Sequence, residues 1–318
     1  MQNITDYHND IIAIDADYVK PLVDAIHLII EGDTAAIIDT GVSHSAPAVM
    51  AALAAYGLAP EQVAYVILTH IHLDHAGGAG ELMARLPKAR LVVHPRGSQH
   101  MVDPSRLLAG TRAVYGEEQT ERLYGTILPV PAERVLEAAD EAVLSLGQRE
   151  LLLLHTPGHA LHHICIVDRK TGHIFTGDTF GLSYRQFDHQ GRQFMFATTT
   201  PVHFDPVALH RSIDRLASFK PEAIYLTHYS QIRDIPRLTR DLKQTIDAHV
   251  AIALAAPGSG QARIDDIKRG LSDWVCERAR QQEWGLQGDA ALDWLAMDID
   301  LNAQGLEVWL ARTRRSPG

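Results

Sequence analysis

A cluster of metal-ligand side chains directly after an apolar run constrains this chain more than any other feature. Residues 64–69 read Ala-Tyr-Val-Ile-Leu-Thr, which predicts a buried β-strand. The residues that follow supply the cluster: His70, His72, Asp74 and His75. If the strand continues through His70, the side chains of His70 and His72 project in the same direction and can bind one ion. Asp74 and His75 then turn toward a second ion.

The donor types of this cluster indicate which metals it binds. Imidazole nitrogen and carboxylate oxygen are ligands that zinc, iron and manganese accept. The two cysteines, Cys165 and Cys276, are far apart in the sequence and fall in a predicted strand and a predicted helix, so they indicate neither a disulfide nor a cysteine zinc site. A site without thiolates leaves the ion a Lewis acid with open positions.

The pattern of apolar residues predicts a mixed domain followed by a helical region. Apolar runs at 22–30 and 35–39 predict two strands joined by a hairpin at Glu31-Gly32-Asp33. Ser45 and Pro47 open a predicted helix that Gly57 closes, with Val49, Leu53 and Tyr56 on one face. The remaining predicted strands are 64–69, 91–93, 143–146, 151–155, 163–167 and 174–176. Two packed sheets flanked by helices would accommodate them.

The organisation of the chain changes at Pro236. Beyond it, apolar residues recur with helical spacing, and residues 256–260 form the only linker-like stretch. We therefore predict a catalytic domain over residues 1–235 and a helical C-terminal extension over residues 236–318. The extension is either a lid over the cleft or a contact in a homodimer.

Three later segments each carry a metal-ligand residue just after an apolar β-like run. They are residues 154–159, 174–179 and 223–228, and they present His159, Asp178 and His228. Side chains from distant parts of a sequence can converge at strand ends. The sequence therefore predicts that these residues complete the shell begun at His70.

The order of these residues resembles the metallo-β-lactamase superfamily, with its H-x-H-x-D-H motif, later histidine, bridging aspartate and final histidine. The resemblance assigns His70, His72 and His159 to one metal and Asp74, His75 and His228 to the other, with Asp178 as the bridge. It implies an α+β fold, a four-layer αβ/βα sandwich, with the metals at one edge between the two sheets. Two divalent ions are expected, zinc foremost, with iron and manganese as alternatives.

The function implied by the resemblance is hydrolysis by a hydroxide held between the two metals. The metals lower the pKa of the bound water to about 7, so this hydroxide forms at neutral pH. Asp74 and Asp178 are the expected catalytic residues, because these ligands can also orient the hydroxide proton. The expected substrate is a small ester, thioester, lactone or related molecule. The similar proteins are the glyoxalase-II-like hydrolases and an uncharacterised cytoplasmic branch with the segments found here at residues 158–163 and 198–201.

Several further residues are candidates for supporting roles. Asp39, in the segment Ile38-Asp39-Thr40-Gly41, matches a family motif in which the aspartate orients a histidine ligand, and a strand-end aspartate that caps a turn is the alternative. A helix opening at Gly77-Gly78 would point its N–H groups toward an anionic substrate group. The candidate substrate contacts are Tyr184, Arg185, His163 and Tyr229.

The composition limits the partners. The net charge of −10 and the sequence pI near 5.9 disfavour nucleic acid, because phosphate backbones favour basic surfaces. No uncharged apolar run of about 18 residues is present, and the N-terminus is polar and acidic. We therefore expect a cytoplasmic protein that acts on a small molecule, with no membrane or nucleic-acid partner.

Two other functions remain open. Mononuclear-iron persulfide dioxygenases keep the same motif, so an iron-dependent oxidoreductase is one alternative. A non-catalytic binding or regulatory protein on the same fold is the second, although such a protein would be expected to lose ligands and none is missing here.

Overall fold

The structure, a computed structural model, describes residues 4–315 of the chain and divides into two compact units. The described part of Met1–His155, together with His162–Gly177 and Pro221–Gln231, forms the first unit. The second consists of Thr156–Leu161, Asp178–Lys220 and the described part of Ile232–Gly318. These units are defined by packing, and the division into domains at residue 236 stays a prediction.

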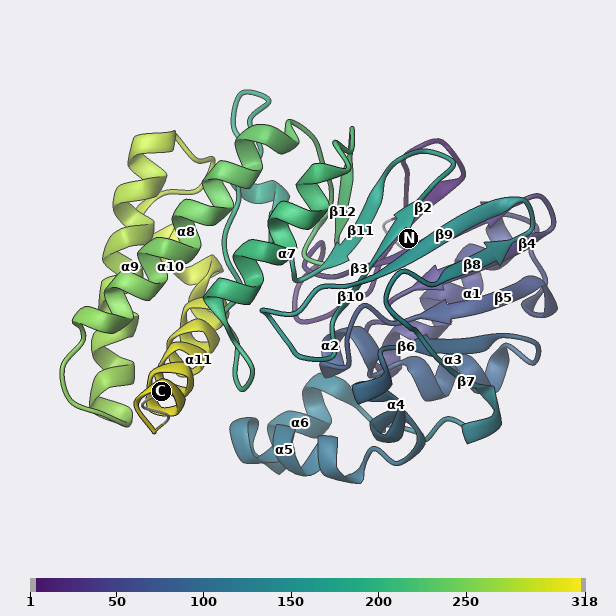
Figure 1. Ribbon diagram of the computed structural model, residues 1–318, viewed down its shortest axis with the longest axis horizontal. Helices are drawn as coiled ribbons and strands as arrows, with labels where there is room; N and C mark the ends of the chain where they lie inside the picture. Colours follow the sequence, from purple (N-terminus) through teal and green to yellow (C-terminus); the bar gives the residue numbers. More distant parts are fainter. Residues whose placement is uncertain (1–3, 316–318) are drawn as a thin grey trace. The chain divides into compact units, whose positions relative to one another are not determined.

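The first unit contains a seven-stranded sheet whose strands follow one another in chain order (Figure 1). Its strands are β1 (Ile4–Asp6), β2 (Ile11–Asp15), β3 (Ala25–Glu31), β4 (Thr34–Ile38), β5 (Val63–Ile67), β6 (Arg90–Val93) and β7 (Val135–Glu137). The strands from β1 to β4 pair antiparallel, and those from β4 to β7 pair parallel. The change occurs at β4, whose carboxyl end lies beside that of β5, so both strands deliver their following residues to the same edge.

A second sheet has six strands in the order β13-β12-β11-β10-β9-β8. Its strands are β8 (Val143–Leu146), β9 (Arg149–His155), β10 (Ile164–Asp168), β11 (Ile174–Gly177), β12 (Ile224–Leu226) and β13 (Ser230–Ile232). The strands from β8 to β11 pair antiparallel, whereas β12 pairs parallel with β11 after a long excursion of the chain. The residues after β11 and β12 therefore leave the sheet at the same edge.

The two sheets pack face to face through a buried apolar cluster. Ile38, Ile67 and Val92 of the first sheet belong to the same cluster as Leu153 and Phe175 of the second. A second cluster fills the space between the other face of the first sheet and helices of this unit, the first four foremost. The helices of this unit are α1 (Ala46–Ala55), α2 (Leu73–Ala76), α3 (Ala79–Arg85), α4 (Pro95–Val102), α5 (Ser105–Tyr115) and α6 (Glu117–Tyr124). The predicted fold class, two packed sheets flanked by helices, is confirmed.

Local sequence signals explain the hairpin and the first long helix. The hairpin pairs Glu31 with Thr34, and Gly32 takes the left-handed φ of +59° that the turn requires. Helix α1 has a proline in its first turn, and Val49 and Leu53 are buried as predicted. Tyr56 was wrongly placed on that buried face, because it is the residue that caps the helix and is 37% exposed. Single 3₁₀ turns occupy Ser43–Ser45, Pro60–Gln62, Ala132–Arg134 and Arg185–Phe187.

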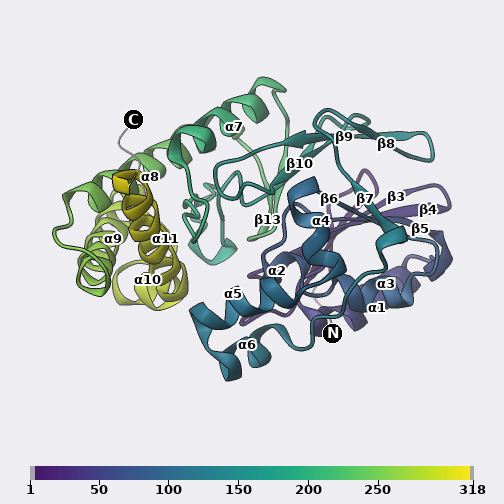
Figure 2. The same cartoon turned by 60° about the horizontal axis from the view of Figure 1, so that its bottom comes forward.

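The second unit is mostly helical. It contains α7 (Pro206–Ser218), α8 (Ile235–Ala255), α9 (Gln261–Gln282), α10 (Gly288–Trp294) and α11 (Ala296–Arg315), and Figure 2 shows the last four side by side. The predicted helical character beyond Pro236 is confirmed, and the linker-like residues 256–260 connect α8 to α9. Across residues 4–315, no helix combines the length and the apolar character that crossing a membrane requires.

A buried histidine lies within the aromatic core of this helical region. His249 of α8 is 0% exposed and contacts the rings of Phe196 and Trp274 at centroid distances of 5.0 and 5.6 Å. Among the described residues, neither of its ring nitrogens has a hydrogen-bond partner. Burial therefore lowers the pKa of His249 to about 3, from an ordinary value of 6.5.

We predict that His249 makes folding sensitive to acid. Its pKa is lower in the folded state than in the unfolded state, so the unfolded chain binds the proton more readily and stability falls as the pH drops from about 6.5 toward 3. The slope is about 1.4 kcal/mol per pH unit within that window. Urea unfolding at pH 7.5 and pH 5 should therefore show that His249→Leu loses about 2 kcal/mol less than the wild type over this interval. The exposed His189, changed to glutamine, serves as the control, and equal pH slopes for His249→Leu and wild type would contradict the assignment.

Candidate metal centre

The histidine cluster begins after β5 has ended and not on the strand itself. Strand β5 ends at Ile67, so the assumption that it continues through His70 was wrong. The reason is local: the backbone N–H of Thr69 donates to the Asp39 carboxylate over 2.8 Å instead of to a neighbouring strand. The chain then enters the short helix α2, which carries Asp74 and His75.

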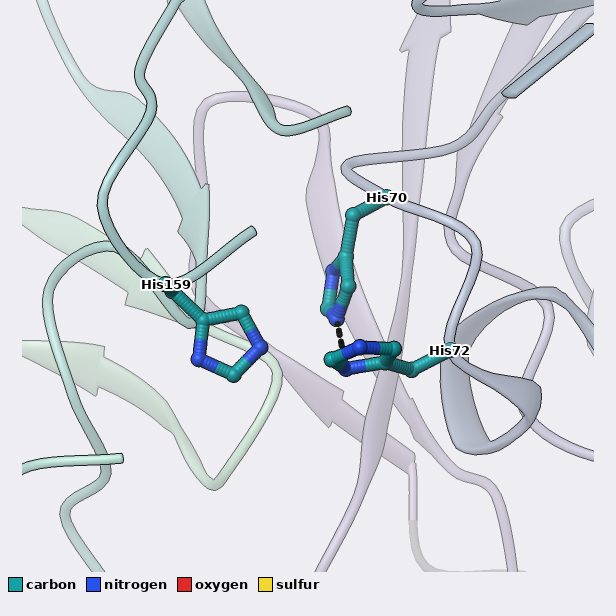
Figure 3. A group of neighbouring side chains, drawn as sticks. All are labelled: His70, His72 and His159. Carbon is teal, nitrogen blue, oxygen red and sulfur yellow. Dashed lines mark hydrogen bonds between the residues drawn. The ribbon is translucent and has the colours of Figure 1, made fainter. Parts of the chain in front are cut away.

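His70 and His72 nevertheless direct their rings toward one another (Figure 3). Nε2 of His70 lies 2.9 Å from Nδ1 of His72. Two nitrogens that bind one tetrahedral zinc at about 2.0–2.1 Å are separated by about 3.3 Å. The observed separation of 2.9 Å is therefore close to the spacing that a shared ion requires. His70 is buried and His72 is half-buried.

Asp74, His75 and His228 form a second group within the first unit. Each offers one ligand atom, and these atoms lie within 4.8 Å of one another. Oδ2 of Asp74 lies 3.5 Å from Nε2 of His75 and 3.6 Å from Nε2 of His228. These separations match the edges of a tetrahedral site, and the Asp74 side chain is 22% exposed, so solvent reaches this group.

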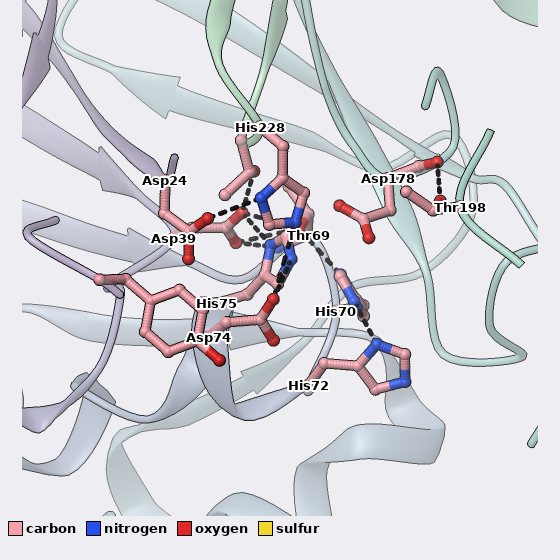
Figure 4. Close-up of polar contacts among 12 residues, drawn as sticks. Asp24, Asp39, Thr69, His70, His72, Asp74, His75, Asp178, Thr198 and His228 are labelled. Atoms are coloured by element: carbon pink, nitrogen blue, oxygen red, sulfur yellow. Dashed lines mark hydrogen bonds and ion pairs between the residues drawn. The ribbon is translucent and has the colours of Figure 1, made fainter. Parts of the chain in front are cut away.

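Asp39 is the centre of a hydrogen-bond network that supports the ligands (Figure 4). It follows β4 with a left-handed φ of +56°, which turns its carboxylate toward the cluster. Oδ2 of Asp39 lies 2.8 Å from Nδ1 of His75 and also accepts a hydrogen bond from Oγ1 of Thr227 over 2.7 Å. Thr69 donates to the same carboxylate from its backbone N–H and from its hydroxyl. A carboxylate can only accept, so Nδ1 of His75 carries the proton and Nε2 keeps its lone pair for a metal.

The same argument fixes the tautomer of His70. The Thr69 hydroxyl uses its proton on Asp39 and lies 3.2 Å from Nδ1 of His70. It can therefore accept a hydrogen bond from that nitrogen, which leaves Nε2 of His70 as the lone-pair atom facing His72.

His228 is held by a carboxylate of its own. Its Nδ1 lies 2.6 Å from Oδ1 of Asp24 and 3.3 Å from the carbonyl oxygen of Val23, and both of these atoms are acceptors. Nδ1 of His228 therefore carries the proton, and Nε2 faces Asp74. Asp24 is 0% exposed, and burial raises its pKa to about 6 although the neighbouring His228 acts in the opposite direction.

The second unit brings together the remaining two predicted ligands. Nε2 of His159 lies 3.5 Å from Oδ2 of Asp178. Nδ1 of His159 lies 3.1 Å from Oγ1 of Thr198, which donates its proton to the backbone carbonyl of Asp178 and so can accept from the histidine. Nε2 of His159 is therefore the lone-pair atom, and both side chains are buried.

Each unit thus carries its own part of the predicted ligand set. The first unit holds His70, His72, Asp74, His75 and His228, and the second holds His159 and Asp178. In the sequence, Asp178 is the residue after β11, and His159 lies in a six-residue segment after β9. The donor types, the spacings and the tautomers fit a divalent ion, while the closure of all seven ligands around two ions stays a prediction.

The four candidate substrate residues all lie in buried or half-buried surroundings. His163 is 1% exposed, and its ring stacks on that of His70 at 4.8 Å. The Tyr184 hydroxyl donates to Asp298, and the Arg185 guanidinium contacts the carbonyl of Ser183 and the Asp188 carboxylate. Tyr229, the residue after His228, is buried. These contacts do not test a role in binding substrate, which stays a prediction for all four.

The two glycines at the predicted start of the following helix do not supply N–H groups for an anion, and a role for the helix itself stays a prediction. The backbone N–H of Gly77 donates to the Leu73 carbonyl, and that of Gly78 donates to the Gly41 carbonyl. Helix α3 begins only at Ala79 and has seven residues. The N–H groups of both glycines are therefore already used within the fold.

Sequence reasoning missed four residues that support the ligands. Thr69 and Thr227 each stand next to a ligand histidine and hold Asp39, and Thr198 holds His159. Asp24 fell inside the predicted strand 22–30, where a carboxylate in an otherwise apolar run was the available signal. A buried charge in such a run needs a partner, and here that partner is His228.

Comparison with known families gives one extended match. Residues 21–228 match the family model described as the metallo-beta-lactamase superfamily. This range begins just before β3 and ends at His228, so it includes both groups of ligands described above and more than half of the chain.

Three relatives illustrate the range of similar proteins. The metallo-beta-lactamase fold-containing protein ST1585 of Sulfurisphaera tokodaii is 26% identical over 196 residues, which are 60% of this chain and 67% of that protein. The acyl-coenzyme A thioesterase MBLAC2 of Gallus gallus is 30% identical over 118 residues, 35% of this chain and 40% of that protein. The atrochrysone carboxyl ACP thioesterase of Aspergillus fumigatus is 28% identical over 118 residues, 37% of this chain and 28% of that protein. The chain therefore matches less than half the length of either thioesterase.

The crystal structure of ST1585 resembles the whole chain. It matches with a TM-score of 0.65 and 22% identity and covers 96% of this chain and 98% of the other. At this identity the likeness shows the fold alone, and it confirms the predicted α+β sandwich with a helical C-terminal region.

Proposed function

The chain belongs to the metallo-beta-lactamase superfamily, and from that premise we propose that it is a zinc-dependent hydrolase that cleaves thioester or related ester bonds of small molecules. The observation that carries this proposal is the group of Asp74, His75 and His228, whose spacing and tautomers suit a divalent ion. The thioesterase names of two relatives support the choice of a thioester.

The proposed site uses seven ligands and two ions. His70, His72 and His159 would hold one ion, Asp74, His75 and His228 would hold the other, and Asp178 would serve both. The 3.5 Å separation of His159 Nε2 and Asp178 Oδ2 supports this division. In the proposal Asp178 serves both ions, so it must lie near His159, which serves the first. The ions, when bound, supply a water with a pKa lowered to about 7 and polarise the scissile carbonyl.

The protein's own residues then have distinct tasks. Asp74 and Asp178 hold the proton of the attacking water through their carboxylate oxygens, and the exposure of Asp74 lets that water exchange with solvent. Asp39 keeps the proton of His75 on Nδ1, so the ligand nitrogen stays unprotonated. Tyr184, Arg185, His163 and Tyr229 remain the proposed contacts to the rest of the substrate.

The test is a substrate panel with metal-loaded protein. We expect zinc-loaded protein to cleave acyl-coenzyme A and other acyl thioesters in preference to lactones and phosphodiesters. A chelator should abolish the activity, and re-addition of zinc should restore it. The His72→Ala and Asp178→Ala variants should lack it, and activity that survives in both would mean that another site or a contaminant is responsible.

The same preparation separates the two alternative functions. One tightly held iron per chain with strong oxygen uptake on glutathione persulfide would replace the hydrolase proposal with a dioxygenase. Two bound metals without cleavage of any substrate in the panel would favour a non-catalytic binding protein. Metal analysis alongside each assay therefore decides among the three.

A further inference from the structure

Asp24 is a buried carboxylate beside the proposed site that the proposed chemistry does not use. Its Oδ1 lies 2.6 Å from Nδ1 of His228, and the residue is 0% exposed. Its other oxygen, Oδ2, is buried and has no hydrogen-bond partner among the described residues. Within the described part of the chain, His228 is the one ionisable side chain that this carboxylate contacts directly.

The backbone holds Asp24 and His228 in place. The N–H of Ala25, next to Asp24, donates to the carbonyl of Thr227, next to His228, over 2.7 Å. On the other side, the N–H of Ala16 donates to the carbonyl of Asp24 over 2.8 Å. These hydrogen bonds fix the main chain at Asp24 and beside His228, so the backbone itself places the two side chains next to each other.

Three candidate ligand histidines of the first unit differ in the group that contacts their Nδ1 atom. His75 is backed by the Asp39 carboxylate and His228 by the Asp24 carboxylate, whereas Nδ1 of His70 faces the neutral hydroxyl of Thr69. A hydrogen bond to an ionised group is stronger than one to a neutral group, and a carboxylate behind a ligand histidine makes its other nitrogen more basic. Asp74 adds a carboxylate as a direct ligand in the same group.

We infer that Asp24 is the positioning residue of His228, and that it makes the Asp74–His75–His228 group the tighter of the two metal sites and the first to fill. The inference rests on the proposed function, because it treats this group as a metal site. Asp24 contacts neither the ion nor the substrate. It acts by fixing the proton of His228 on Nδ1 and by placing a negative charge behind that ring.

The test is a titration of metal-free, full-length protein with Co²⁺, followed by visible absorption and by calorimetry. Wild-type protein should bind Co²⁺ in two steps. Asp24→Ala should weaken the first step about 10- to 100-fold and leave the second unchanged. Asp24→Asn should fall between the two, because an amide oxygen still accepts the Nδ1 proton but carries no charge. His72→Ala should weaken the second step alone.

Asp15 provides the matched control. It is 6% exposed and accepts hydrogen bonds from the backbone N–H groups of Asp17 and Leu22, so it supports the loop that leads to Asp24. Asp15→Asn should leave both binding steps as in the wild type. A loss of the first step in this variant equal to that in Asp24→Ala would mean that loop distortion, and not the Asp24 charge, controls binding, and the inference would fail.

Failure of the inference differs from failure of the proposed function. If wild type binds two Co²⁺ ions and both Asp24 variants bind the first within twofold of it, the inference is wrong and the hydrolase proposal stands. The same holds if His72→Ala, and not Asp24→Ala, weakens the first step. If wild-type protein binds no Co²⁺ at all, the proposed function itself is wrong. The Asp24→Asn variant keeps the side-chain shape, so the comparison survives if Asp24→Ala does not fold.

Discussion

Replacing Asp74 with asparagine is expected to lower kcat/KM for thioester cleavage by about 10²- to 10⁴-fold. The Asp74 carboxylate lies 3.5 and 3.6 Å from Nε2 of His75 and of His228, so it is placed as the third ligand of that group. An amide oxygen is a weaker ligand, and it cannot take up the proton of the attacking water. The variant should also retain less metal, which elemental analysis of the purified protein would measure.

Glu81 offers a control for the Asp74 experiment. It lies close in sequence on α3 and pairs with Arg85 near the surface, where such an ion pair contributes about 0–1 kcal/mol. Glu81→Gln should retain wild-type kinetics and metal content. If Asp74→Asn kept kcat/KM within a few-fold of the wild type at full metal content, Asp74 would have no role in the reaction.

Replacing Asp39 with alanine is expected to lower the free energy of unfolding by about 3–5 kcal/mol. The change removes the acceptor for Nδ1 of His75, for the backbone N–H and hydroxyl of Thr69, and for the hydroxyl of Thr227. Each buried donor left without an acceptor costs about 1–3 kcal/mol. Urea unfolding in the presence and absence of a chelator would separate this loss from the loss of bound metal.

The Asp39 comparison needs a variant that keeps the backbone. Asp39 has a φ of +56°, a conformation that asparagine adopts more readily than alanine. Asp39→Asn should therefore lose less stability than Asp39→Ala, and the exposed Asp33→Ala should change it by less than about 0.5 kcal/mol. A loss below about 1 kcal/mol in Asp39→Ala would show that these donors find other acceptors.

Much of the fold could be predicted because the apolar pattern is strong where the sheets are buried. The strands from β8 to β11 are short apolar runs separated by turn residues, and the structure has them close to their predicted bounds. Helices α4 to α7 were not predicted. For α5 the sequence signal is weak, because none of its residues is buried in the fold.

The candidate ligand residues could be picked out because their chemistry and spacing are visible in the sequence itself. His70, His72, Asp74 and His75 lie within one loop and one short helix, so local spacing alone indicates a common role. The prediction erred where it relied on strand geometry beyond Ile67, because the Asp39 carboxylate takes the backbone N–H that a longer strand would have used. The apolar pattern of a strand does not show that a side chain from a distant part of the sequence will accept one of its backbone N–H groups.

The residues that support the ligands could not be predicted for a different reason. Asp24 and His228 are 204 positions apart, and Thr198 is 39 positions from His159. Their pairing depends on strand order, which brings the start of β3 beside the residues after β12. Aspartate and threonine are common residues, so neither type marks such a contact in the sequence.

The position of β12 has a consequence for how the protein is made. This strand enters the second sheet beside β11 only after α7 has been synthesised, and His228 is the second residue after it. A nascent chain that ends before residue 221 has an unpaired edge on β11 and lacks both the last ligand and the partner of Asp24. Contacts of such long sequence separation form late in folding. We therefore expect a metal to bind the proposed Asp74–His75–His228 group only after residues 221–228 have emerged from the ribosome.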